Sequence, residues 1–445
     1  MDNNFDQRKL RVFYSLVIAL VAIAAITFLW SQSSVGRTSA LLKHELESAS
    51  RDGMAISGAD FQRRYSVPES SNARKRIQQA FAEMKRWQKT PAGRAYAKLE
   101  RALSSKAGLR PEDVSLLKPT LTSAQSVISI LKSASEKPKL DFERDWSKGP
   151  ELQFPEYSDA RPSITLLIAD SEVKAHDGDY TGAIEDLDAG AKLSRLIGTD
   201  PSLIAKLIGC TMRSQISTRL EGIIRSVASN SGLLTKCKKV VTDFGSDVSL
   251  QEPIESEMLF GRSAVQLIAK PNNSAMFGAS NQSVLSMSRF GPARAAYELK
   301  YVQTMHELYR ELGEQKGSIP GMTAVVKKIE AKVRQSSDWT YGLTKLLTPS
   351  FVGSVSAIGD FQARQHVLLC AIDLLIKRNQ TGSFPKLMLG TTGQWSDPFT
   401  EKPLIYKLTS KGFLIYSCGA DGEDDGGEPM GNTRFSHFDI PFKFP

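Results

Sequence analysis

Five acidic residues close together near the C-terminus are the strongest candidates for chemistry in this chain. They fall within eight residues and are interspersed with glycines. Carboxylates at such spacing repel one another unless a cation or solvent neutralises them, and hard oxygen ligands on a glycine-hinged loop suit Ca²⁺. The run therefore predicts either a calcium site or a solvated acidic turn that binds nothing specifically. Its members are Asp421, Glu423, Asp424, Asp425 and Glu428.

A β-hairpin is expected directly before these acids, because two short apolar strands flank a three-residue turn. Residues 404–408 and 413–417 are the strands, and residues 410–412 are the turn. The spacing of the first acids matches the opening of an EF-hand calcium loop, but a strand comes before it where the EF-hand has a helix. Asn432 also stands where that loop needs a glutamate. The acidic run is therefore not an EF-hand.

Three motifs accompany the hairpin in a fixed order. Gly-x-Phe-Pro stands at 382–385 after a predicted helix, Asp-Pro-Phe at 397–399, and Tyr-Ser-x-Gly-Ala-Asp-Gly at 416–422. In this order they resemble the C-terminal half of the major pseudopilin of bacterial type II secretion. The resemblance implies an α+β module whose loop holds a stabilising calcium ion. The candidate calcium ligands, from the acidic run and the resemblance together, are Ser417, Asp421, Glu423, Asp424 and Asp425.

The N-terminus departs from the pseudopilin pattern. In that family a short leader is cut after a glycine, and a glutamate stands near the start of the membrane helix. Residues 7–12 of this chain contain neither a glycine nor a glutamate. We therefore expect a long anchored protein that carries a pseudopilin-like terminal module, and not a subunit that is processed and assembled as a pilin.

One uncharged apolar run near the N-terminus predicts a membrane-spanning helix. Residues 12–30 form this run, and its residues at about 1.5 Å each span roughly 28 Å, enough for a hydrocarbon core. Three basic residues precede the run and two follow it closely, so the positive-inside rule places the short N-terminus in the cytoplasm and the rest outside. The basic residues are Arg8, Lys9, Arg11, Arg37 and Lys43.

A cleaved signal peptide is the alternative interpretation, because small residues at 31–34 offer a cleavage site. The apolar run is longer than the usual core of a signal peptide, about 7–15 residues, and this favours an uncleaved anchor. Both interpretations put most of the chain outside the cytoplasm. Together with the pseudopilin resemblance, they imply a single-pass protein of the bacterial inner membrane with a periplasmic body. That location argues against nucleic acid and against nucleotides as partners.

The composition fits a globular protein and excludes several classes. The chain has 445 residues, of which 41% are hydrophobic and 24% charged, and this excludes disorder, collagen and disulfide-stapled miniproteins. A single long apolar run excludes a polytopic membrane protein. The net charge of +9 is spread thinly, without the basic stripe typical of nucleic-acid binding. The four cysteines form no CxxC pair and no two histidines stand at ligand spacing, so zinc and redox sites are not expected.

Helical spacing of apolar residues dominates up to residue 400, so the predicted fold class is mainly α with a small C-terminal α+β module. Clusters of glycine, proline, asparagine and serine divide the helices. The expected domains are a cytoplasmic stub and anchor (1–35), a helical body (36–270), a flexible loop (271–291), a second helical part (292–360) and the pseudopilin-like module (361–445).

Residues 164–198 resemble a tetratricopeptide-type helical hairpin. Two amphipathic segments flank a Gly-Asp-Tyr turn at 178–180, and small residues would let the two helices pack closely. Gly190 and Ser171 depart from the preferences of that family, and the sequence holds no second good copy. An ordinary antiparallel hairpin therefore fits these residues at least as well as a peptide-binding repeat.

Three classes of function follow from these patterns. The leading expectation is a non-enzymatic envelope protein whose helical body and calcium-stiffened tip contact other envelope proteins, in connection with secretion or pilus systems. The first alternative is a helical-repeat adaptor that binds peptides. The second is an extracytoplasmic hydrolase. Two Ser-x-x-Lys matches end at Lys118 and Lys132, but the sequence lacks the partner motifs Ser-Asp-Asn and Lys-Thr-Gly, so these matches carry little weight.

Overall fold

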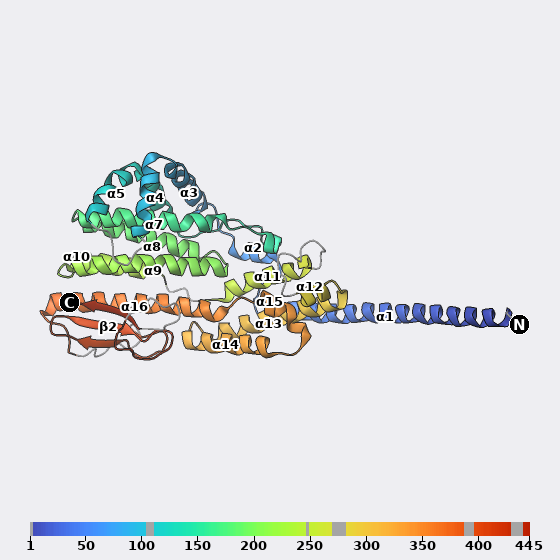
Figure 1. Cartoon of the computed structure of the whole chain (residues 1–445). Helices are drawn as coiled ribbons and strands as arrows, with labels where there is room; N and C mark the ends of the chain where they lie inside the picture. The colour runs from blue at the N-terminus through green and yellow to red at the C-terminus, as the bar shows by residue number, and fades with distance from the viewer. Residues whose placement is uncertain (1–2, 104–110, 246–248, 269–281, 387–395, 429–438) are drawn as a thin grey trace.

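The protein is built almost entirely from helices, with one small antiparallel sheet near the C-terminus (Figure 1). The predicted class, mainly α with a small C-terminal β element, is therefore confirmed. The helices stack side by side, and one long helix projects from the end of the stack opposite the C-terminus. The computed structural model describes residues 3–103, 111–245, 249–268, 282–386, 396–428 and 439–445.

Helix α1 (Asn3–Arg51) is a single uninterrupted helix of 49 residues. It contains no proline and one glycine, Gly36, so little in its sequence disturbs the hydrogen-bond ladder. Among the described residues it is the one helix long and apolar enough to cross a membrane, and the large apolar side chains at 17–30 that the structure describes are exposed. Beyond residue 30 the helix packs along α13 (Gly291–Glu314). The boundary predicted at residue 35 therefore falls inside one continuous element.

The hairpin predicted at 164–198 forms the centre of the stack. Helices α7 (Pro155–His176) and α8 (Tyr180–Gly198) are its two arms, and Gly178 turns the chain with a φ of 84°, a left-handed conformation that favours glycine. Helices of the same chain cover the hairpin on both sides (Figure 1). They are α3 (Arg74–Gln88), α4 (Pro91–Leu103), α5 (Pro111–Ser123) and α6 (Gln125–Ser135) on one side, and α9 (Leu203–Ser226) and α10 (Ser231–Asp243) on the other.

Further helices on α13 and α11 build the end of the body next to α1. Of the loop predicted at 271–291, residues 271–281 lie outside the described residues. Residues 282–288 form a helix instead, because Leu285 is buried against Tyr297 and Leu343 in a small core of its own. The elements of this end are α2 (Gly58–Tyr65), η1 (Trp146–Glu151), α11 (Gln251–Ile268), α12 (Gln282–Ser288), α14 (Ile319–Gln335), η4 (Trp339–Tyr341) and α15 (Gly342–Leu347).

The C-terminal part is a helix with a three-stranded antiparallel sheet packed on it. Helix α16 (Phe351–Thr381) ends at Gly382, whose φ of 81° closes the helix. Strands β1 (Ile405–Leu408) and β2 (Phe413–Ser417) form the predicted hairpin, and β3 (Ile440–Phe444), which the sequence does not predict, pairs with β2. Because α16 also packs on α9 and α10, the predicted boundary at residue 361 lies within one helix and one hydrophobic core.

Candidate functional site

The C-terminal loop that carries the predicted calcium ligands begins where β2 ends. Ser417 is the last residue of β2 and is fully buried. Its hydroxyl donates to Asp397 Oδ1 at 2.9 Å and accepts from the Gly419 backbone N–H at 3.1 Å. The Ser417 hydroxyl is therefore engaged within the fold of the module, at the base of the acidic loop.

The four acidic candidates lie on the surface of this loop. Asp421 Oδ1 accepts from the Glu423 N–H at 3.2 Å. Asp424 Oδ1 accepts from the Tyr416 hydroxyl at 2.7 Å and from the Gly426 N–H at 2.9 Å, and these hydrogen bonds lower the pKa of Asp424. The loop is thus held in part by hydrogen bonds among its own residues and by one from Tyr416 of β2.

These side chains do not converge on one point. Within the described residues, no group of three or more His, Cys, Asp or Glu side chains is placed to hold a metal ion. Calcium needs about six to eight oxygen ligands, so the arrangement shown is not a preformed site. Calcium binding by Ser417, Asp421, Glu423, Asp424 and Asp425 therefore stays a prediction.

Two carboxylates outside the acidic run hold the loop in place. Asp397 is buried, and its Oδ2 accepts from the Cys418 N–H at 2.8 Å while its Oδ1 accepts from the Phe399 N–H and the Ser417 hydroxyl. Asp439 is also buried; its Oδ2 accepts from the Gly427 N–H at 2.6 Å, and burial raises its pKa. An aspartate before proline is a recognisable turn signal, so Asp397 could have been found from sequence, whereas Asp439 carries no such signal.

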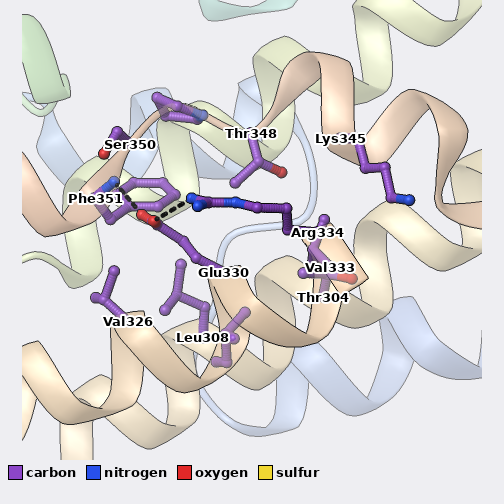
Figure 2. Close-up of a pocket in the computed structure, with 12 residues that line it drawn as sticks. Thr304, Leu308, Val326, Glu330, Val333, Arg334, Lys345, Thr348, Ser350 and Phe351 are labelled. Carbon is purple, nitrogen blue, oxygen red and sulfur yellow. Dashed lines mark hydrogen bonds and ion pairs between the residues drawn. The ribbon is translucent and has the colours of Figure 1, made fainter. Parts of the chain in front are cut away.

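A cavity of about 220 Å³ lies between α13, α14 and the segment that leads into α16 (Figure 2). Its titratable lining residues are Glu330, Arg334 and Lys345. Glu330 Oε1 accepts from the backbone N–H groups of Phe351 at 2.8 Å and Val352 at 3.2 Å, so this carboxylate caps the N-terminus of α16. Arg334 pairs with the other oxygen of Glu330 at 3.7 Å, and Lys345 Nζ donates to a backbone carbonyl. The charged groups of the cavity therefore stabilise helix ends.

The junction between α1 and the body is held by side-chain contacts between one histidine and two carboxylates. His306 of α13 is buried, and its Nδ1 lies 2.6 Å from Glu45 Oε1 while its Nε2 lies 2.8 Å from Asp52 Oδ2. These two contacts fix the last turns of α1 against the body.

A buried acid, Glu255 of α11, secures the segment that follows α1. Glu255 of α11 accepts from the Ala55 N–H at 3.3 Å, from the Tyr65 hydroxyl at 3.1 Å and from the Arg64 guanidinium. Burial raises the pKa of Glu255, and Arg64 opposes that shift. These contacts connect the residues directly after α1 to α11 and α2. The C-terminal end of α1 is therefore followed by a segment that is hydrogen-bonded to the body.

The lysines of the two Ser-x-x-Lys matches serve in ion pairs. Lys118 Nζ lies 2.7 Å from Asp177 Oδ2, and Lys132 contacts Asp186, which also pairs with Lys174 at 2.7 Å. Asp186 is fully buried, and this burial raises its pKa to about 6. Both lysines thus tie together helices of the central stack.

Comparison of the chain with protein-family models, with curated proteins and with solved structures found no match.

Proposed function

We propose that this protein is a single-pass membrane anchor and scaffold, which holds a rigid helical body at a membrane surface for contacts with other envelope proteins. The observation that carries the proposal is the continuity of α1. One helix combines an exposed apolar run with a C-terminal part that is fastened to the body through His306 and the core residue Ala49. A helix with an apolar, exposed half is expected to lie in lipid.

The orientation follows from charge and from the pseudopilin resemblance. Basic residues concentrate before the apolar run, so the N-terminus is proposed to be cytoplasmic. The resemblance supports the bacterial inner membrane and a periplasmic body. The sheet lies at the end of the body away from α1 (Figure 1), where it is available to partners. The acidic loop lies beside Thr400, next to the segment that contacts the start of α14, and calcium is a proposed stabiliser of the loop.

The two alternatives have less support. A peptide-binding repeat needs a concave groove across several stacked hairpins. Described helices stack on both sides of the α7–α8 hairpin, as such an array requires, but the cavity described above lies away from this hairpin, between α13, α14 and the start of α16. A hydrolase needs convergent titratable groups in a pocket, whereas Glu330 and Arg334 of the described cavity are engaged in capping and pairing. Scaffold function is therefore the proposal that fits the geometry best.

Membrane extraction of the full-length chain tests the proposal. We expect the chain to stay in carbonate-washed membranes, to be released by detergent, and to retain residues 1–30 by intact mass. Replacing Leu20 and Ile23 by arginine places two charges in the apolar run, each costing about 2.5–3.5 kcal/mol at mid-bilayer, so this variant should appear folded in the soluble fraction.

Leu41→Arg is the matched control, since Leu41 is 59% exposed on the same helix beyond the apolar run. It should remain membrane-bound. Release of the unaltered chain by carbonate, or loss of residues 1–30 from the mature protein, would refute the anchor.

A further inference from the structure

The distance between the apolar run of α1 and the body is short. Val35 is half-buried, and a β-carbon placed on Gly291, the first residue of α13, would lie 3.7 Å from Val35 Cγ2. Val35 stands five residues after Trp30, which corresponds to about 7.5 Å along the helix. The headgroup layer on each side of a bilayer is about 5–8 Å thick. The start of α13 therefore falls at the level of the headgroups if α1 spans the bilayer.

Three exposed apolar side chains lie near this end of α13. Met287 is 43%, Phe290 51% and Trp339 50% exposed. The Tyr297 hydroxyl lies 3.8 Å from Met287 Sδ, and the Tyr297 ring centroid lies 5.5 Å from that of Trp339, so α12, α13 and η4 meet here. Figure 1 shows α12 at the end of the body from which α1 projects. We name Met287, Phe290 and Trp339 the membrane-facing corner.

The neighbouring charges suit a lipid surface. Arg37 is exposed on α1 close to Val35, where its guanidinium donates to the Ser33 hydroxyl at 3.1 Å. Arginine side chains at this depth reach lipid phosphates, and tryptophan and other aromatic rings favour the boundary between headgroups and acyl chains. The acid beside Trp339, Asp338, is turned into its own helix end, where it accepts from the Thr340 N–H at 2.9 Å.

We propose that the membrane-facing corner inserts into the headgroup layer of the same bilayer that α1 spans. The inference rests on the proposed anchor and adds a second contact with lipid. Two contacts fix the tilt of the body, whereas one helix alone leaves it free to swing. The body then stands in one orientation, with the C-terminal sheet pointing away from the membrane (Figure 1).

Spin-label accessibility in nanodiscs of zwitterionic and anionic lipid tests this contact with the full chain. The native cysteines are all buried, so single cysteines introduced on the surface can be labelled selectively. Phe290→Cys and Trp339→Cys probe the corner at two independent positions. Leu408→Cys is the matched aqueous control, because Leu408 is 48% exposed on β1 at the far end, and Ile23→Cys is the lipid control on α1.

For each spin label we compare its accessibility to oxygen, which partitions into lipid, with its accessibility to a water-soluble nickel chelate. The ratio of oxygen accessibility to nickel accessibility at positions 290 and 339 should be several-fold higher than at position 408 and lower than at position 23. Ratios equal to that at 408 would overturn the membrane-facing corner while leaving the anchor intact. Low accessibility to both reagents would also overturn it, since it would mean that another protein surface covers the corner. An aqueous ratio at 23 would instead refute the anchor, so the two failures are distinguishable.

Discussion

Replacing Asp397 by alanine should loosen the turn beneath the acidic loop. The change leaves the Cys418 N–H and the Ser417 hydroxyl without their acceptor in a buried setting, and the Phe399 N–H without it in a partly buried one. Each buried donor left unpaired lowers the free energy of unfolding by about 1–3 kcal/mol. Removal of the buried carboxylate offsets part of this loss, so we expect the free energy of unfolding to fall by about 3 kcal/mol.

Hydrogen exchange measured by mass spectrometry gives a local readout of this loss. At about 1.4 kcal/mol per factor of ten, the amide of Cys418 should exchange about 100-fold faster in the Asp397→Ala variant. Asp421→Ala is the control, because Asp421 is exposed and accepts one weak loop bond, so its effect should stay within about 0.5 kcal/mol. Equal effects of the two substitutions would show that Asp397 does not organise the turn.

Three further predictions concern the loop and the core. Millimolar calcium should raise the midpoint of thermal unfolding, and Asp421→Ala/Asp425→Ala should abolish that shift; no shift in the unaltered chain would rule out the calcium site. Gly261→Ala should destabilise the packing of α11 on α13 by about 2 kcal/mol or more in denaturant titration, because the added β-carbon would lie 2.1 Å from Tyr301 Cζ; a neutral effect would contradict this packing. Burial raises the pKa of Glu257 from its ordinary 4.5 to about 7, so the folded chain binds this proton more tightly and loses stability as pH rises through that window. Glu257→Gln should therefore be stabilised by about 2 kcal/mol at pH 8 and not at pH 5, and equal unfolding midpoints of variant and parent at both values would refute the burial of this carboxyl.

Local patterns were enough to predict several elements. The apolar run, the hairpin around Gly178 and the β1–β2 hairpin each depend on residues close in sequence, so spacing and turn chemistry reveal them. Helix α12, in contrast, was not predicted, because small residues and turn formers made residues 271–291 look like a loop. This helix depends on burial of Leu285 by residues distant in the sequence.

Non-local contacts account for what the sequence did not reveal. Strand β3 contains Pro441, so its sequence does not indicate a strand. It forms a strand because it pairs with the free edge of β2. The contact between the Ser417 hydroxyl and Asp397, twenty residues earlier in the chain, is likewise not evident from local spacing. Asp397 and Asp439, which hold the loop, lie before and after the acidic run at 421–428 and are not part of it.

A distance measurement along α1 tests the central claim that one unbroken helix joins the apolar run to the body. Leu20 and Leu41 are exposed, at 65% and 59%, and lie 21 residues apart, which is about 32 Å in a continuous helix. Spin labels at Leu20→Cys and Leu41→Cys of the full chain in nanodiscs should give a single narrow distance near that value by pulsed electron resonance. A broad distribution, or a distance much shorter than this, would show that α1 breaks before it reaches the body.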